Sequence, residues 1–266
     1  MERRVTLKSA AQIERMAIAG RLVSGVLDRV GEAIRPGVTS QELDSLAGEL
    51  IRSAGATPSF VGVPGHGGPY RHTLCVSIDD EVVHGVPGRR AIAEGQIVSV
   101  DAGAIVEGWH GDAARTWIVG HVPDEVRALV EATQRAMYAG IAAAIPGNHI
   151  SDISAAVEDV ALENGYGVVR QFVGHGIGTE MHEEPQVTNF RSGQRGRRLE
   201  PGLCLAIEPM FTLGGHEVDL RPDGWTVVTR DGQIAAHWEH SIAITDDGPR
   251  ILTEGAPDPP NEASSA

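Results

Sequence analysis

A helix-breaking dipeptide that occurs twice constrains this chain more than any other feature. Pro36-Gly37 follows an Ala-Ile-Arg run, and Pro146-Gly147 follows Ala-Ile 110 residues further on. Proline cannot donate the backbone hydrogen bond that a helix needs, and glycine readily adopts the positive φ of a tight turn, so each dipeptide should end a helix. The repeat predicts two halves with one helix–Pro-Gly–helix plan, packed about a pseudo-dyad with a cleft between them. The simpler alternative is that Pro-Gly ends many unrelated helices.

Four amphipathic helices are predicted around these two signals. Apolar residues recur every three or four positions in each of them, which gives each helix one buried face. Ser9 and Gln12 have the spacing of a capping box, as do Thr39 and Glu42, so both helices of the first half have a marked start. The predicted helices span Ser9–Arg35, Thr39–Gly55, Asp124–Ala144 and Ser151–Asn164.

Short runs with strand character follow the helices in each half. They are Ile97–Ala104, Trp109–Val119, Leu203–Glu208, Trp225–Thr229 and Trp238–Thr245. Helical runs followed by strand runs are typical of an α+β fold with a largely antiparallel sheet. We expect one domain over residues 1–254, with halves of about 1–120 and 121–254, and a disordered tail at 255–266.

Two aspartates occupy strand positions that packing alone would not select. The first two strand runs flank a turn that we centre on Val106-Glu107, which places Asp101 opposite Asp112 with Cβ atoms about 5 Å apart. Aspartate is depleted in strands, and like charges opposite one another are unfavourable. A bound cation with carboxylate ligands would remove that penalty. The alternative is that both side chains lie on a solvated face.

Further side chains in the second half suit metal binding or acid–base chemistry. His175 lies between two glycines, and His182 follows it in the same loop. Glu208 ends a strand-like run, 107 residues after Asp101 and so close to the internal period, and Glu239 begins another run. Four carboxylates in one place would repel one another unless cations held them, and a pair of divalent metals suits hydrolysis. Each of these residues could instead be a solvated or structural side chain.

Composition narrows the function classes. Lysine and arginine number 22 and aspartate and glutamate 36, so the formal charge is −14. An acidic chain repels phosphate backbones, which argues against nucleic acid as a specific ligand. The cysteines, Cys75 and Cys204, are too few for a disulfide framework and should be small buried side chains. No run reaches the ~18 apolar residues of a membrane span and the N-terminus lacks an apolar signal core, so we expect a cytoplasmic protein without a membrane partner.

A set of short motifs resembles that of the type I methionine aminopeptidases. The motifs are Glu-Val-Val-His-Gly-Val-Pro at 81–87, the Asp101 and Asp112 pair, Gly-His-Gly-Ile-Gly at 174–178, His-Glu-Glu-Pro at 182–185, Ile-Glu-Pro at 207–209 and Glu-His-Ser at 239–241. The resemblance covers about Ser9–Thr253, and all five acid and histidine ligands occur in the family's order and spacing.

The resemblance implies a pita-bread fold, in which two pseudo-symmetric α+β halves surround a curved antiparallel sheet. It implies removal of the initiator methionine from nascent proteins when the next residue is small. Two divalent ions per chain, drawn from Co, Mn, Fe or Zn, would serve as cofactors. Asp101, Asp112 and Glu239 match the ligands of one ion, and those of the other are matched by Asp112, His175, Glu208 and Glu239.

The resemblance also implies roles in the reaction. Glu208 would pass a proton from the attacking water to the leaving amine. His182 would stabilise the tetrahedral oxyanion, and His84 would hydrogen-bond the scissile amide. The pocket for the methionine side chain is best matched by Tyr70, Cys75 and Trp225.

The chain departs from the family pattern near that pocket. Residues 60–73 differ from the family's shorter Gly-Tyr-rich stretch, Met181 replaces a common phenylalanine, and His237 replaces a common glutamine. An arginine-rich loop at 191–198 is expected to be solvated, with a contact to ribosomal RNA as the alternative. The implied partners are the N-terminal methionine of nascent peptides and the ribosome, and the implied state is a monomer.

Two other functions stay open at this point. A proline dipeptidase shares the ligand set, although such enzymes usually carry an extra N-terminal domain, for which the 100 residues before Asp101 leave too little room. A non-catalytic peptide-binding module of the same fold is the other alternative, although such members lose metal ligands and this chain has all five.

Overall fold

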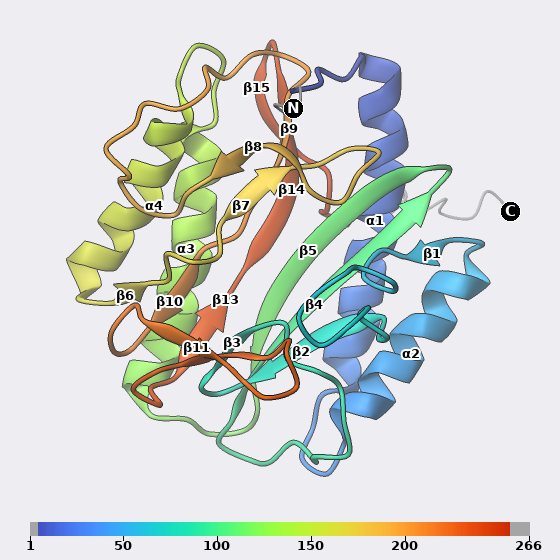
Figure 1. Cartoon of the computed structure of the whole chain (residues 1–266), viewed down its shortest axis with the longest axis vertical. Helices are drawn as coiled ribbons and strands as arrows, with labels where there is room; N and C mark the ends of the chain where they lie inside the picture. Colours follow the sequence, from blue (N-terminus) through green and yellow to red (C-terminus); the bar gives the residue numbers. More distant parts are fainter. Residues whose placement is uncertain (1–4, 256–266) are drawn as a thin grey trace, which may run out of the picture.

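The computed structural model describes residues 5–255 and contains the four predicted helices (Figure 1). They are α1 (Ala10–Ala33), α2 (Ser40–Ser53), α3 (Asp124–Ala143) and α4 (Ile150–Asn164). Each predicted helix is confirmed, with ends that differ from the prediction by at most two residues. The predicted disordered tail at 255–266 lies outside the described residues except for Gly255.

The capping boxes and the repeated Pro-Gly turn appear as predicted. The Ser9 and Thr39 side chains accept hydrogen bonds from the backbone N–H groups of Gln12 and Glu42, whose side chains accept bonds from the cap residues in return. Gly37 has φ +93° and Gly147 has φ +95°, so the second turn has the same handedness as the first. Glycine reaches this region without the steric cost that a Cβ atom would add. The internal repeat is therefore structural.

An antiparallel sheet of nine strands forms the centre of the molecule. Its main path runs β1 (Thr57–Pro58), β4 (Ile97–Val106), β5 (Trp109–Ile118), β14 (Glu239–Thr245), β9 (Cys204–Ile207), β7 (Gly174–Gly176) and β8 (Glu183–Val187), with β2 (Leu74–Ile78) paired to β4 and β15 (Gly248–Ile251) paired to β14. Two small sheets flank it, one of β13 (Ala235–His237), β10 (Met210–Thr212) and β6 (Gly167–Val168), the other of β11 (Val218–Leu220), β12 (Val227–Thr229) and β3 (Glu81–Val83).

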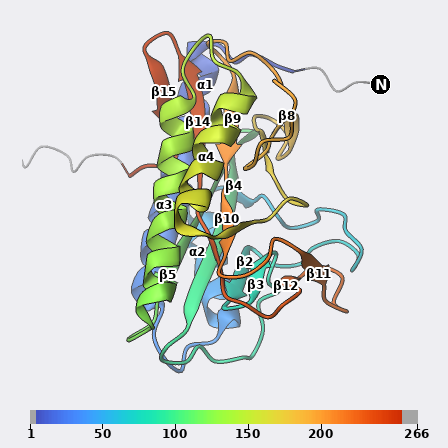
Figure 2. The ribbon, with the colours of Figure 1, turned by 90° about the vertical axis from the view of Figure 1, so that its left-hand side faces the viewer.

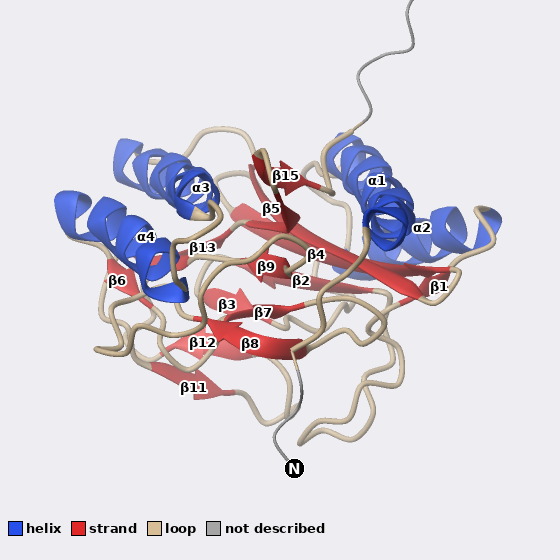
Figure 3. Ribbon diagram, turned by 90° about the horizontal axis from the view of Figure 1, so that it is seen from above, coloured by secondary structure: helices blue, strands red, loops and turns tan. Residues whose placement is uncertain are grey.

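The layers explain why one face of the sheet is free to hold a site. Both helix pairs cover the same face, with α1 and α2 on one side and α3 and α4 on the other (Figures 2 and 3). The small sheet of β6, β10 and β13 packs under α3 and α4, whereas the small sheet of β3, β11 and β12 lies on the opposite side, together with several loops (Figure 3). Along β4, Val98, Val100 and Ala102 are buried in the core under α1 and α2. Because side chains alternate along a strand, Ser99 and Asp101 point to the other face. The α+β class and the curved antiparallel sheet between two similar halves are confirmed.

The register of the β4–β5 hairpin corrects one prediction. Asp112 pairs with Gly103, and Asp101 pairs with Ala114, so the aspartates are diagonal neighbours and not directly opposite. The turn is Glu107-Gly108, and both residues have positive φ, +49° and +83°. Such two-residue turns match the twist of the flanking strands, and glycine favours them, which our placement at Val106-Glu107 overlooked. The observed register differs from the predicted one by two residues, since Asp101 pairs with Ala114 and not with Asp112. Because this is an even number, both aspartates still share one face of the sheet.

Two glycines allow α1 to lie directly on the sheet. A Cβ atom at Gly20, within α1, would lie 2.1 Å from the carbonyl oxygen of Leu252. A Cβ atom at Gly111 on β5 would lie 2.6 Å from backbone atoms of Ala19 and Gly20. Both positions therefore exclude any side chain, and this close approach supports β5 just before Asp112. In the part of the chain that the structure describes, no helix has the length and apolarity needed to cross a membrane.

Gly20→Ala should lower the free energy of unfolding by about 1–3 kcal/mol, because the added methyl group would meet backbone atoms that cannot rotate away. Gly25→Ala in the same helix is the matched control, since no described heavy atom outside its own neighbourhood lies within 4 Å of that Cβ position. We expect the control to gain ~0.5–1 kcal/mol from helix propensity. Urea unfolding followed by circular dichroism measures both, and equal effects at the two positions would contradict the packing described here.

Candidate active site

One row of side chains crosses the open face of the sheet from β2 to β9. Cys75 pairs with Asp101, Asp101 pairs with Ala114, and Ala114 pairs with Glu239. Because His240 pairs with Ile207, Glu239 is level with Glu208, the residue that follows β9. Paired residues of neighbouring antiparallel strands point to the same face, so a thiol and three carboxylates line up with a small alanine between them. The missing bulk at Ala114 leaves space between Asp101 and Glu239.

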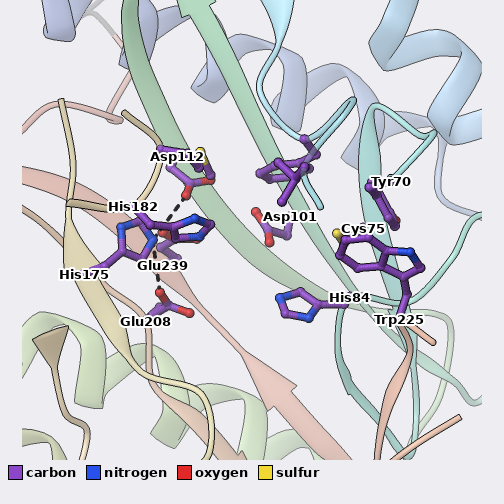
Figure 4. A pocket seen from close by; sticks show the side chains of 13 residues that line it. Tyr70, Cys75, His84, Asp101, Asp112, His175, His182, Glu208, Trp225 and Glu239 are labelled. Atoms are coloured by element: carbon purple, nitrogen blue, oxygen red, sulfur yellow. Dashed lines mark ion pairs between the residues drawn. The ribbon is translucent and has the colours of Figure 1, made fainter. Parts of the chain in front are cut away.

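Asp112 and His175 complete the cluster. Asp112 lies two residues before Ala114 on β5 and so shares its face. Ligand atoms of Asp112, His175 and Glu239 all lie within 4.8 Å of one another. The Nε2 atom of His175 is 3.5 Å from Oε1 of Glu208 and 3.8 Å from Oδ2 of Asp112, the two separations drawn as dashed lines in Figure 4. All five sequence-predicted metal ligands therefore meet in one place.

Burial disfavours charge on every member of this cluster. Burial raises the pKa of Asp101 to about 7, although a hydrogen bond with Asp112 opposes the rise. Burial, and then repulsion between neighbouring carboxylates, raises the pKa values of Asp112, Glu208 and Glu239 well above their usual range. Burial also lowers the pKa of His175 to about 3, so its imidazole is neutral at pH 7 and its contacts with Glu208 and Asp112 are not ion pairs.

The donor set fits a divalent cation. Among the described residues, Oδ1 of Asp101, Oδ1 of Asp112 and Oε1 of Glu239 are buried oxygens without a hydrogen-bond partner. Unpaired buried polar atoms are costly, and four clustered acids beside a neutral imidazole cannot satisfy one another. Carboxylate oxygens and neutral imidazole nitrogens are the groups with which proteins bind divalent metals. A cation would satisfy the orphan oxygens and restore the charged state of the acids.

The cluster forms one wall of a pocket whose other end is apolar (Figure 4). The pocket lining includes all ten site residues predicted from the sequence, namely Tyr70, Cys75, His84, Asp101, Asp112, His175, His182, Glu208, Trp225 and Glu239. It also includes Phe60, Val63 and Met181. Phe60, Tyr70, Cys75 and Met181 form a buried apolar cluster, with Trp225 packed against it. The cavity thus joins an apolar recess to a group of acids.

Two histidines, His84 and His182, also line the pocket. His84 has φ +58°, a conformation rare for residues other than glycine, and the next residue, Gly85, lies so close to β2 that a Cβ atom there would be 2.2 Å from the carbonyl oxygen of Val76. Burial, and then His182, lowers the pKa of His84 to about 4, so it is neutral at pH 7. The ring of His182 lies 4.5 Å from that of His175, between centroids.

The structure adds residues that the sequence motifs did not single out. The Nδ2 atom of buried Asn189 donates to the carbonyl oxygen of Glu208 at 2.9 Å, which fixes the backbone at that acid. Phe60 and Val63 come from the divergent stretch at 60–73. His237, which replaces the family's common glutamine, places Nε2 3.8 Å from Oε2 of Glu208. Asn189 lies outside every motif, so only the three-dimensional arrangement reveals it.

Comparison with known proteins agrees with this site. Residues 14–246 match the family model "Metallopeptidase family M24". The chain is 44% identical over 250 residues to the methionine aminopeptidase of Clostridium acetobutylicum, covering 94% of this chain and 98% of that protein. It superposes on the crystal structure of methionine aminopeptidase from Rickettsia prowazekii with a TM-score of 0.91 at 34% identity, covering 94% of this chain and all of that chain. An Xaa-Pro dipeptidase from Bacillus anthracis shares the fold, with a TM-score of 0.76 at 24% identity, but this chain spans only 63% of it.

The fold and the donor set define a metal-dependent hydrolase that acts on peptides. The chain belongs to metallopeptidase family M24. The proline dipeptidase alternative is not favoured, because relatives named methionine aminopeptidase are 42–45% identical over 94% of this chain.

Without a metal, stability should fall as the pH rises. The raised pKa values mean that the folded state binds protons on these carboxyls more tightly than the unfolded state does. The resulting contribution to the free energy of unfolding is fully present below the unfolded-state pKa of about 4, and it is lost as the pH rises through the folded-state pKa. That value is about 7 for Asp101. Chelator-treated protein should therefore show a larger rise in Tm on addition of Mn²⁺ at pH 8 than at pH 5, because protons compete with the metal.

Differential scanning fluorimetry at the two pH values measures this effect. Asp112→Asn is the control, since it removes one of the repelling acids and should show a smaller Mn²⁺-induced rise. Equal rises at pH 5 and pH 8 in the unsubstituted protein would contradict the assignment of the carboxylate cluster as the cation site.

Proposed function

We propose that this chain is an aminopeptidase that removes the N-terminal methionine of nascent proteins when the second residue is small. The observation that carries the proposal is a single pocket in which an apolar, sulfur-containing recess is adjacent to a cluster of metal-binding acids. A methionine side chain in the recess would bring its own carbonyl carbon towards the acids. The names of the full-length relatives support the same activity.

We propose that the metal centre holds two divalent ions, for which Co, Mn, Fe and Zn are the candidates. Asp101, Asp112 and Glu239 would hold one, and the other would be held by Asp112, His175, Glu208 and Glu239, with Asp112 and Glu239 shared. When bound, such ions supply Lewis acidity that polarises a carbonyl and lowers the pKa of water. Sharing suits Asp112 and Glu239, because each has one orphan oxygen and both lie within 4.8 Å of His175 as ligands.

Glu208 is the proposed proton carrier. It follows β9 at the end of the row, and its side chain lies beside the neutral imidazole of His175. Burial, and then repulsion from Asp112 and Asp101, raises the pKa of Glu208 above its usual range. A carboxylate of this kind can accept a proton from the attacking water and return it to the leaving amine. Asn189 keeps the Glu208 backbone in place through its hydrogen bond to the carbonyl oxygen.

The two histidines are the proposed hydrogen-bond donors to substrate. An imidazole N–H is a hydrogen-bond donor, so His182 can donate to the carbonyl oxygen as negative charge develops there. His84 can donate to or accept from the scissile amide at the other side of the pocket. Its positive φ and the adjacent Gly85 direct it towards the ring of Phe172, 5.2 Å away between centroids. Strained backbone at a functional position is consistent with such a role.

The methionine side chain would lie between Tyr70, Cys75 and Trp225, with Phe60 and Met181 nearby. Tyr70 is held by hydrogen bonds from its hydroxyl to the carbonyl oxygens of Leu74 and Gly85, at 2.8 and 3.3 Å, so its ring presents a fixed surface. Cys75 is a free, buried thiol, and burial raises its pKa well above the usual range, so it acts as an apolar side chain. Sulfur and aromatic contacts suit a thioether.

We further propose a monomer that acts in the cytoplasm on chains leaving the ribosome. Only some arginines of the loop at 191–198 are available for a contact with ribosomal RNA. Arg191 is already engaged by Glu158 and Asp159, and Arg197 by Glu200. Arg195 and Arg198 are exposed in the same loop and are the side chains that an RNA surface would meet.

Metal-reconstituted protein should release methionine from Met-Ala-Ser, and much less from Met-Trp-Ser, because the metal cluster and the two histidines leave little room beside the scissile bond. It should not cleave Ala-Pro or N-acetyl-Met-Ala-Ser. Liquid chromatography of the products measures each rate. Cleavage of Ala-Pro at a comparable rate would favour the dipeptidase alternative, and metal binding without methionine release would favour a binding module.

Glu208→Gln should lower kcat on Met-Ala-Ser by about 10²-fold or more, because the amide keeps an oxygen ligand but cannot carry a proton. Metal content, measured by plasma mass spectrometry, should stay near that of the parent protein. Glu200→Gln, at a half-exposed surface acid paired with Arg197, is the control and should leave kcat unchanged. Normal turnover by a metal-loaded Glu208→Gln protein would refute the proton-carrier role.

A further inference from the structure

The loop that carries His182 belongs to the last strand pair of the sheet. β7 and β8 form an antiparallel pair at the end of the strand order, and the connecting residues 177–182 form the loop. The pairing register shifts between His175 and Gly176, so the ladder is irregular next to the site. The first residues of the loop are tied to the sheet, since the N–H of Ile177 donates to the carbonyl oxygen of Cys204 at 3.1 Å and the carbonyl oxygen of Gly178 accepts from the N–H of His110 at 2.9 Å. His182 lies at the other end of the loop, and positioning it to within a fraction of an ångström requires a further restraint.

The side chain of Glu183, the residue after His182, provides connections in two directions. Its Oε1 atom accepts a hydrogen bond from the backbone N–H of Thr179, at 3.0 Å, within the same loop. Its Oε2 atom accepts bonds from Nζ of Lys8, at 2.6 Å, and from Oγ1 of Thr6, at 2.7 Å. One carboxylate therefore closes the loop on itself and ties it to the N-terminal segment of the chain, 175 residues away.

Lys8 is anchored to the rigid part of the molecule. Its backbone N–H donates to the carbonyl oxygen of Gly202 at 2.7 Å, and the N–H of Gly202 donates to Ile244 on β14 at 2.9 Å. The following residue, Ser9, caps α1. The contact is also tightly packed, because a Cβ atom at Gly178 would lie 2.4 Å from Oε1 of Glu183 and 2.6 Å from Cε of Lys8.

The ion pair is shielded from water. The Lys8 side chain is 4% exposed and the Glu183 side chain 11% exposed. Ion pairs on a protein surface contribute little, but removing one partner of a buried pair leaves an uncompensated charge that must be solvated. The loop would have to open to solvate it, and His182 would move with the loop.

From these contacts we infer that Lys8 is a positioning residue for catalysis: through its ion pair with Glu183 it holds the His182 loop in the geometry that places the imidazole at the substrate carbonyl. The first half of the chain thereby controls a donor that the second half supplies. Lys8 does not touch the pocket, since neither it nor Thr6 belongs to the pocket lining. This inference rests on the proposed function for the role of His182, but the clamp itself does not.

Lys8→Met tests the clamp, because methionine keeps most of the apolar stem and removes the charge. In the metal-loaded enzyme we expect kcat on Met-Ala-Ser to fall about 10- to 100-fold, the effect of a donor misplaced by about 1 Å, with KM changed by less than about threefold because the methionine recess is untouched. Glu183→Gln should act in the same direction. Glu14→Gln, which breaks the exposed pair of Glu14 with Arg250, is the matched control and should leave kcat unchanged.

A double-mutant cycle separates positioning from a general loss of structure. In a His182→Ala background, Lys8→Met should lower kcat no further, because Lys8 acts only through the imidazole that His182→Ala removes. The same fold-loss in both backgrounds would overturn the inference, and so would unchanged kcat in Lys8→Met alone.

Hydrogen exchange provides a readout that does not depend on the substrate. Lys8→Met should accelerate exchange of the Thr179 amide at least tenfold, with the β5 amides unchanged. Unchanged Thr179 exchange would overturn the clamp. If the unsubstituted enzyme released no methionine while exchange responded as expected, the proposed function would fail and the clamp would stand.

Discussion

The arrangement of this molecule follows from the cost of keeping four carboxyl groups together away from water. Asp101, Asp112, Glu208 and Glu239 lie on the open face of one sheet, where burial raises the pKa of each. Orphan oxygens remain on three of them among the described residues. A sequence under selection for stability alone would replace such a cluster with apolar side chains. The cluster is stable in its charged form only with a bound cation. Burying these four acids together therefore creates both the site and its requirement for a metal.

The duplicated plan explains how the acids come together from distant parts of the chain. The first half supplies Asp101 and Asp112 on the hairpin β4–β5. The second half supplies Glu208, directly after β9, and Glu239 on β14. β5 and β14 pair at the middle of the sheet, so the halves meet at the acids. Both helix pairs bury the opposite face (Figure 3), and the acids line a pocket on the face without helices. The boundary that we predicted between the two halves, near residue 120, stays a prediction.

Local sequence patterns predicted the helices and singled out the acids and histidines of the site. The pocket residues Tyr70, Cys75 and Trp225 came only from the family resemblance, and contacts between residues far apart in the sequence were not predicted. Capping boxes and 3.6-residue periodicity are properties of a few neighbouring residues, so the ends of α1 were predictable. The turn at Glu107-Gly108 was misplaced by one residue, because the hairpin register depends on backbone twist as well as on the acids it positions. The Lys8–Glu183 pair joins residues whose separation of 175 no motif reports. Contacts of that kind depend on packing of the whole chain.

The metal centre connects these observations, since the repeat, the row of acids and the neutral His175 all meet there. Crystals of Mn²⁺-reconstituted protein, with anomalous diffraction data collected above the manganese absorption edge, would test it most directly. Two anomalous peaks about 3.5–4 Å apart are expected, both between Asp101 and Glu208 and both close to Asp112 and Glu239. A map with no peak at the carboxylates, or with manganese bound only elsewhere on the surface, would contradict the assignment of this cluster as a metal site.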